Sequence, residues 1–163
     1  MKYELLVDSR PNEVVIALLK DKKLIELHKE PIGTKFSVGD IFLAKVKKII
    51  TGLNATFVDV GYERDGFLHY LDLGVKFKTF QKFTQRNLAG KLNTASLKNF
   101  KLEEEIDKSG SITDTLQSGN QILVQVAKEP ISTKGPRLTT EITIAGRYMV
   151  LVPFSNKVSV SQK

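Results

Sequence analysis

Cysteine and tryptophan are both missing from this sequence of 163 residues, and methionine occurs only twice. Without cysteine the chain can form neither disulfides nor thiolate zinc sites. Long apolar runs are missing too, since no stretch approaches the roughly 20 apolar residues of a membrane-spanning helix. The opening residues MKYELLVD contain neither the apolar run nor the small-residue cleavage site of a signal peptide. We therefore expect a cytoplasmic chain without a membrane segment.

Acidic residues are fewer than basic residues in this sequence. Lysine and arginine total 25 against 18 aspartate and glutamate residues, which gives a formal net charge of +7. Hydrophobic residues make up 41% of the chain, enough to bury a real core. A basic chain of this kind favours a polyanionic partner, with nucleic acid first and an anionic membrane surface second.

Residues 55–70, with the sequence ATFVDVGYERDGFLHY, read as two short strands joined by a polar turn between glycines. Side chains alternate between the two faces of a strand. This places Phe57 with Asp59 and Phe67 with His69, on faces separate from the aliphatic residues. Aromatic rings among polar side chains on a sheet suit the stacking of nucleic-acid bases. The alternative stays open that both phenylalanines belong to the core, where phenylalanine is usually found.

The segment ATFVDVGYERDGFL fits the pattern A-x-F-V-D-x-G-x-E-R-x-G-F-L and resembles the S1-type OB domain of the RNase E/G family of bacterial endoribonucleases. The resemblance implies that Phe57 and Phe67 contact single-stranded RNA. His69 joins them as a candidate because it shares the face of Phe67. The implied fold is mainly β, a five-stranded S1-type OB barrel flanked by incomplete RNase H-like and 5′-sensor strands.

The resemblance divides the chain into three parts. Residues 1–36 correspond to the first strands of an RNase H-like subdomain, and the pattern predicts strands at 3–7, 13–19 and 24–28. Residues 37–128 correspond to the S1 domain, with its first strand at 41–50 and its last clear strand at 122–126. Residues 129–163 correspond to an incomplete 5′-sensor region.

Lysines at 45, 47 and 48 make the first barrel strand basic, either as a solvated face or as phosphate contacts. The long connection 72–118 is harder to interpret, and we expect a mobile loop because long connections are usually mobile or functional. It contains a basic-aromatic stretch around Phe77, Phe80 and Phe83, which is a second candidate RNA surface. Residues 97–106 have the composition of a short helix.

The segment KEPISTKGPRLTT resembles the family signature K-E-x-x-x-x-K-G-x-x-L-T-T, which implies that Lys134 contacts RNA. Alternatively, Lys134 is an exposed loop residue that binds nothing. IAGRYMVLVP resembles the family's L-A-G-x-Y-x-V-L-x-P segment, and this assigns Gly146 and Val150 to sensing of the RNA 5′ end. Alternatively, Gly146 serves a turn and Val150 the core. Gln162 and Lys163 stand where many family members have two arginines.

The resemblance implies the RNA-binding N-terminal region of a Mg²⁺-dependent endoribonuclease that cleaves single strands in RNA processing, including ribosomal RNA processing, and in RNA turnover. The family's catalytic domain and zinc-link come further along the chain, so we expect these residues alone to bind RNA without cutting it. We expect no cofactor within this chain, including at the neighbouring carboxylates Asp59, Glu63 and Asp65. Magnesium, zinc and homo-oligomerisation are expected of the full-length protein.

Two other interpretations remain open. The chain could be a stand-alone, non-enzymatic OB-fold RNA-binding protein associated with translation or the ribosome. It could also be a scaffold domain whose positive charge binds an acidic protein. If the chain is a fragment, its first and last strands would expose apolar edges that the rest of the protein covers, so we expect self-association or partial disorder at both ends.

Overall fold

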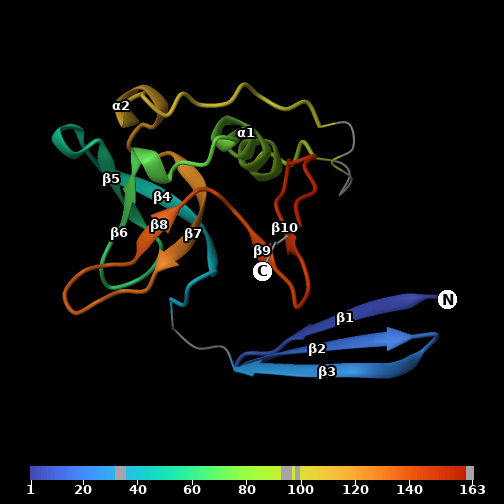
Figure 1. Ribbon diagram of the computed structural model, residues 1–163. Helices are drawn as coiled ribbons and strands as arrows, with labels where there is room; N and C mark the ends of the chain where they lie inside the picture. Colours follow the sequence, from blue (N-terminus) through green and yellow to red (C-terminus); the bar gives the residue numbers. More distant parts are fainter. Residues whose placement is uncertain (32–35, 93–96, 98–99, 161–163) are drawn as a thin grey trace. The chain divides into compact units, whose positions relative to one another are not determined.

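The structure is a computed structural model that describes residues 1–31, 36–92, 97 and 100–160. It divides into two compact units, Met1–Lys35 and Phe36–Lys163. The first unit holds a small sheet, and the second holds a barrel with its helices (Figure 1).

The first unit is the predicted three-stranded antiparallel meander. Its strands are β1 (Tyr3–Ser9), β2 (Glu13–Lys20) and β3 (Lys23–Pro31), in the order β1-β2-β3. Asp21 and Lys22 form the turn between β2 and β3 with φ angles of 48° and 68°. Two-residue hairpin turns with positive φ match the natural twist of paired strands. The central strand is half-buried along its whole length, while its two neighbours are almost entirely exposed.

The second unit is built on a closed five-stranded barrel, as the family resemblance implied. Its strands are β4 (Ile41–Ile50), β5 (Ala55–Asp59), β6 (Gly66–His69), β7 (Gln121–Lys128) and β8 (Arg137–Thr139). They follow the order β4-β5-β6-β8-β7. The β6–β8 pair is parallel and the other pairs are antiparallel. The mainly β architecture and the barrel are consistent with an OB fold.

Alternation along the strands builds the barrel core. Side chains alternate between the inside and the outside of the strands, and the inward-facing residues Val46, Val58, Leu68, Val124 and Leu138 are each at most 1% exposed. Residues on the outer face, among them Lys45, Phe57 and Phe67, are exposed or half-buried. The sequence pattern therefore fixes which face of each strand is available to a ligand.

The barrel's fifth strand lies later in the chain than expected. The last barrel strand that the sequence pattern predicts is 122–126. The structure adds β8, which follows residue 128 and lies between β6 and β7. It has only three residues, too few for an alternating pattern to show. The loop 129–136 therefore connects two neighbouring barrel strands.

The connection 72–118, expected as a loop, contains helix α1 (Phe77–Leu88). Phe77, Phe80 and Thr84 are all buried on one face of this helix, with the spacing of three and four residues that a packed helix requires. The helix packs against β7. The prediction that Phe77 and Phe80 belong to an RNA surface is therefore wrong, because both rings are inside the protein.

The prediction of a helix at 97–106 is wrong for the residues that the structure describes, because residues 100–106 have no helical structure. This segment lies along α1 instead. The backbone N–H of Glu103 donates to Thr79 Oγ1 at 3.0 Å, and Lys82 and Lys76 form ion pairs with Glu103 and Glu105. Residues 98 and 99 lie outside the described part of the chain.

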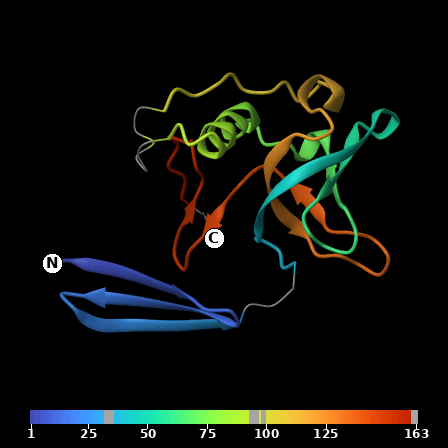
Figure 2. The ribbon, with the colours of Figure 1, turned by 180° about the vertical axis from the view of Figure 1, so that it is seen from behind.

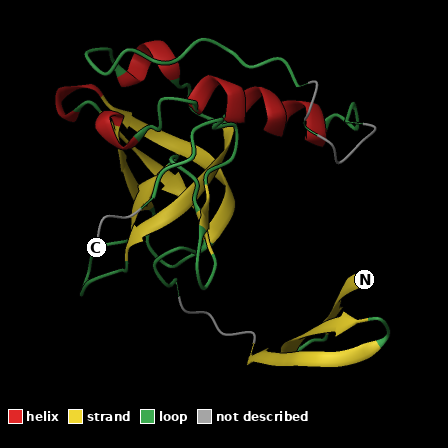
Figure 3. Ribbon diagram, turned by 45° about the vertical axis from the view of Figure 1, so that its right-hand side comes forward, coloured by secondary structure: helices red, strands yellow, loops and turns green. Residues whose placement is uncertain are grey.

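The remaining elements are short. They are the 3-10 helices η1 (Thr51–Leu53) and η2 (Tyr70–Asp72), helix α2 (Ile112–Thr115), and the paired strands β9 (Ile144–Ala145) and β10 (Val150–Leu151). The helices gather at one end of the barrel (Figure 3). The turn 60–65 and the loop 129–136 lie side by side at the other end (Figures 1 and 2). This second end carries the candidate site.

Candidate nucleic-acid interface

Phe57 and Phe67 form an aromatic pair on the outside of the barrel. They are directly opposite each other in the β5–β6 ladder, with ring centroids 5.9 Å apart and ring planes at 68°. Their neighbours along the chain, Thr56, Val58 and Leu68, are fully buried, whereas both phenylalanines are half-buried. The predicted faces are confirmed, and the alternative that both rings belong to the core is wrong.

A cavity of about 630 Å³ lies against this aromatic pair. One side is formed by the two rings and the end of the β5–β6 turn, and the other by the loop that leads into β8. The residues that line it are Phe57, Arg64, Asp65, Phe67, Thr133, Lys134, Gly135 and Arg137. Three of the predicted RNA-binding residues, Phe57, Phe67 and Lys134, thus meet in one cavity although they come from distant parts of the sequence.

Gly135 explains how the two loops come so close. A Cβ atom at this position would lie 2.1 Å from the carbonyl oxygen of Asp65, so no other residue fits without moving one of the loops. The contact continues with the N–H of Phe67, which donates to the carbonyl of Pro136 at 2.8 Å. Close backbone approach of this kind is a reason for glycine in a loop. Gly135 therefore positions Lys134 beside the phenylalanines.

Two ion pairs fix charged side chains at the cavity. The ammonium of Lys47 donates to Asp65 Oδ1 at 2.9 Å. The guanidinium of Arg137 donates to both carboxylate oxygens of Asp72, from Nε at 3.0 Å and from Nη2 at 3.2 Å. Hydrogen bonds to these carboxylates, reinforced by their negative charge, raise the pKa of Lys47 and that of Arg137. The two ion pairs therefore stabilise the charged form of each cation.

Arg64 and Arg137 are lining residues that the sequence analysis did not single out. Arg64 stands in the turn ERDG, within the segment that carried the family resemblance, and a turn arginine is usually only solvated. Arg137 was hidden because β8 is too short to recognise. Once β8 is paired with β6, Arg137 stands beside Phe67 in the ladder.

His69 lies on β6 two residues beyond Phe67, on the same side of the strand. Its Nδ1 accepts a hydrogen bond from the N–H of Leu71 at 3.0 Å and so caps η2. This bond fixes the ring and leaves Nε2 as the nitrogen that carries the proton. His69 does not line the cavity, so it stands apart from the other three predicted residues.

Gly146 and Val150, the predicted 5′-sensing residues, lie in the β9–β10 hairpin. The N–H of Gly146 donates to the carbonyl of Met149 at 2.8 Å and closes the turn, which agrees with the alternative of a turn role. Val150 pairs with Ala145 and is 57% exposed, so the alternative that it belongs to the core is wrong. Neither residue lines the cavity at Phe57. Gln162 and Lys163 lie outside the described residues.

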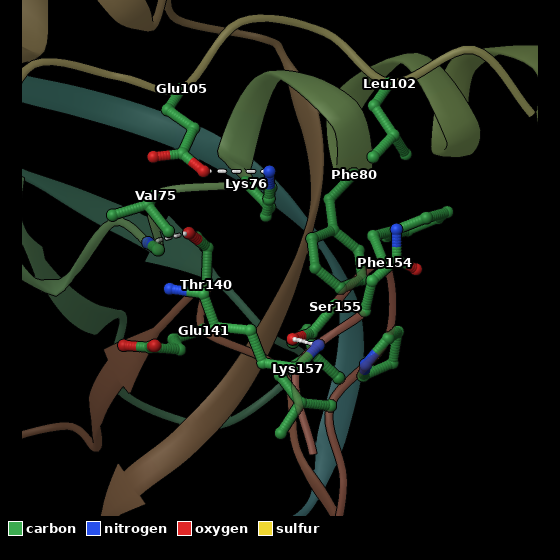
Figure 4. A pocket seen from close by; sticks show the side chains of 15 residues that line it. Val75, Lys76, Phe80, Leu102, Glu105, Thr140, Glu141, Phe154, Ser155 and Lys157 are labelled. Carbon is green, nitrogen blue, oxygen red and sulfur yellow. Dashed lines mark hydrogen bonds and ion pairs between the residues drawn. The ribbon is translucent and has the colours of Figure 1, made fainter. Parts of the chain in front are cut away.

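A second cavity, of about 340 Å³, lies between the start of α1, the segment 100–106 and residues 152–157 (Figure 4). The ion pair between Lys76 and Glu105 spans its rim at 2.8 Å. Phe154 belongs to the segment 152–157 and has a φ of 61°. Its ring packs edge-on against that of Phe80, with the ring centroids 4.9 Å apart. Its walls combine apolar side chains with charges of both signs, and these contacts hold the surrounding segments together.

Among residues 1–31, 36–92, 97 and 100–160, no three histidine, aspartate or glutamate side chains gather so that they could hold a metal ion. Asp59 and Asp65 have other partners, since Asp59 accepts from the N–H of Gly61 and Asp65 from Lys47. Within the described part of the chain, no helix is long and apolar enough to cross a bilayer.

The sequence has relatives of known identity. Over 160 residues, 98% of its length, the chain is 36% identical to ribonuclease G of Haemophilus influenzae. Over 168 aligned residues, covering the whole chain, it is 33% identical to ribonuclease G of Escherichia coli K12. The chain is homologous to the ribonuclease E/G family. This confirms the resemblance seen in the sequence, although no protein-family model matches the chain.

The chain is also similar to ribonuclease E. The chain is 38% identical to ribonuclease E of a Nostoc species over 128 residues, which cover 77% of this chain and 15% of that protein. It spans 29% of the length of each ribonuclease G. These shares are consistent with a front portion of a ribonuclease E/G protein, and the names of the relatives describe much longer chains.

Proposed function

We propose that this chain binds single-stranded RNA at Phe57, Phe67 and Lys134. The observation that carries the proposal is the cavity in which the aromatic pair and this lysine meet. We place this region in a Mg²⁺-dependent, single-strand-specific endoribonuclease of the ribonuclease E/G type, which acts in RNA processing and turnover. The homology favours this assignment over a stand-alone RNA-binding protein.

The two rings suit stacking with an exposed base. Because their planes are at 68°, a base that lies flat on one ring meets the other ring edge-on. Stacking of a base on an aromatic side chain contributes about 1–3 kcal/mol and tolerates any sequence. A single strand offers such unpaired bases, whereas a duplex keeps them stacked inside. The aromatic pair therefore supports single-stranded RNA as the ligand.

Lys134 supplies the electrostatic part of the binding. It stands in an exposed loop at the cavity, where a lysine can reach a phosphate of the bound strand. Neutralising phosphates releases condensed counterions, so the affinity for RNA falls as salt rises. The chain's net charge of +7 acts in the same direction.

The remaining functional assignments concern the longer protein. We propose that this chain binds RNA without cleaving it, and that catalysis, magnesium and zinc belong to other parts of a ribonuclease E/G protein. We assign 5′-end sensing to the hairpin with Gly146 and Val150, and a contribution to the RNA surface to His69. Cytoplasmic location and homo-oligomerisation of the full protein remain our expectations.

Fluorescence anisotropy with a labelled single-stranded RNA tests the proposal. We expect wild type to bind in a salt-sensitive manner, and the Phe57→Ala/Phe67→Ala variant to lose most of that affinity. Tyr3→Ala is a matched control, because it removes an exposed aromatic ring from the other unit. Equal affinity of the double variant and wild type would refute the stacking site. Cleavage of the RNA in the presence of Mg²⁺ would refute the assignment of catalysis to other regions.

A further inference from the structure

One residue on each strand of the barrel falls on a single line across the strands. The line follows the ladder pairings from β4 through β5, β6 and β8 to β7, and its members are Lys48, Phe57, Phe67, Arg137 and Lys128. We call this line the cross-strand row. Its phenylalanines are half-buried, and its lysines and arginine are exposed.

The arrangement of the cross-strand row is cation, aromatic, aromatic, cation, cation. Neighbouring strands are about 4.8 Å apart, so the row covers roughly 19 Å measured along the curved wall of the closed barrel. Proteins that bind single strands combine a basic groove along the backbone with aromatic rings for the bases. The row contains both parts in one line, with the positive charges on either side of the rings.

We infer that Lys48 and Arg137 hold the RNA phosphates on the two sides of the aromatic pair, and that Asp72 positions Arg137 for this contact. This inference rests on the proposed binding of RNA at Phe57 and Phe67. It adds two phosphate contacts and a positioning residue.

Arg137 is held ready for such a contact. Asp72 binds its guanidinium through two hydrogen bonds, at 3.0 and 3.2 Å. A guanidinium has five donors in a rigid plane, so three remain for a ligand. Two fixed bonds also remove the freedom that a flexible side chain would lose on binding RNA. Asp72 is thus a positioning residue for Arg137.

Lys48 reaches the row because of an irregularity in β4. The pairing with β5 shifts between Val46 and Lys48, so that both Lys47 and Lys48 are exposed while Val46 stays buried. Such a bulge turns two successive side chains outward. Lys47 pairs with Asp65, and Lys48 takes the register position beside Phe57.

The salt dependence of RNA affinity tests the inference. Each phosphate contact on a single strand contributes about 0.7 to the slope of log affinity against log salt. We expect Lys48→Gln to lower the slope by about 0.7 and to weaken binding uniformly across RNA sequences. Lys91→Gln is the control, since it removes one positive charge that lies off the row.

Arg137 needs a different variant, because its removal alone would leave Asp72 as an unpaired negative charge near the RNA. The variant Asp72→Asn/Arg137→Gln removes both charges and keeps the net charge of the chain. We expect it to lower the slope and the affinity as well, because the phosphate contact is lost. Circular dichroism checks its fold, and if it does not fold, Lys48→Gln decides alone.

Three results separate the inference from the proposed function. If wild type does not bind RNA, or if the Phe57→Ala/Phe67→Ala variant binds equally well, the proposed function fails and the inference fails with it. If the phenylalanines matter but Lys48→Gln and the charge-neutral variant behave like Lys91→Gln, only the inference is overturned. If both row variants lower the slope and Lys91→Gln does not, the inference is supported.

Discussion

Phe57 and Phe67 face each other across β5 and β6 with their ring centroids 5.9 Å apart, on the outside of the barrel. A second group of aromatic residues, Phe80, Phe83, Phe100 and Phe154, has centroid distances of 4.9 to 6.0 Å around helix α1. The first pair lines the cavity that also contains Lys134, whereas the rings of the second group pack against one another and hold segments of the chain together. The two groups should therefore respond differently to substitution.

Phe154→Ala should destabilise the protein and leave RNA affinity unchanged. Phe154 contacts Phe80, Phe83 and Phe100, so its removal leaves a gap among these rings. We expect a loss on the order of 2 kcal/mol in the free energy of unfolding, less than for a fully buried phenylalanine because Phe154 is half-exposed. Urea denaturation measures it. An RNA affinity that falls in the folded variant would contradict the separation of the two groups.

Gly135→Ala should weaken RNA binding. The new methyl group would lie 2.1 Å from the carbonyl oxygen of Asp65, so the loop with Lys134 must move away from the aromatic pair. Gly52→Ala is a matched control, since a methyl group there has open space around it. Anisotropy titrations compare the two. Wild-type affinity for Gly135→Ala would show that the closeness of the loops is irrelevant to binding.

The segment 100–106 should loosen from α1 in acid. Lys82 holds the pKa of Glu103 below its ordinary value of 4.5, and Lys76 does the same for Glu105. Because both pKa values are lower in the folded state, the stabilisation is fully present above about pH 4.5 and is lost as the pH falls through the lowered values. The effect is small, since the pairs are partly exposed and screened by solvent.

Thermal unfolding from pH 7 to pH 3 measures this loss when wild type is compared with Glu103→Gln/Glu105→Gln. The variant lacks both ion pairs at every pH. The difference between the two unfolding temperatures should therefore shrink as the pH falls. A difference that stays constant down to pH 3 would show that these ion pairs do not stabilise the fold.

The three-stranded sheet of the first unit should cause self-association. Leu6 and Leu27 are 57% and 51% exposed and flank Ala17 on one face, so they form an uncovered apolar strip. We expect the sedimentation coefficient to rise with protein concentration. Leu6→Glu/Leu27→Lys keeps the net charge and should suppress the rise. A monomer at all concentrations in wild type would refute the expectation.

The faces of the strands could be predicted because alternation depends only on local pattern, whereas the five-stranded barrel was implied by the family resemblance. The segment around Phe57 and Phe67 shows that pattern without interruption, and its faces are as predicted. The hairpin at Asp21 and Lys22 was equally local. Lys134 was assigned from a family signature, and only the structure places it in the same cavity as the phenylalanines.

What the sequence did not reveal depends on tertiary packing. Helix α1 has lysines between its phenylalanines, and this pattern resembles a basic surface. In the structure Phe77, Phe80 and Thr84 share one face of the helix, and that face is buried. The strand β8 has only three residues and is defined by its partners β6 and β7 rather than by its own pattern. The position of Arg137 beside Phe67 could therefore not be predicted without the pairing of β8 with β6.

The most direct test of base stacking is nuclear magnetic resonance of the phenylalanine rings during titration with a short single-stranded RNA. Ring currents of stacked bases shift the signals of the rings they cover. We predict large shifts for Phe57 and Phe67, and none for Phe80 and Phe154, which are packed around α1. Shifts confined to Phe80 and Phe154, or binding without any shift at Phe57 and Phe67, would contradict the account.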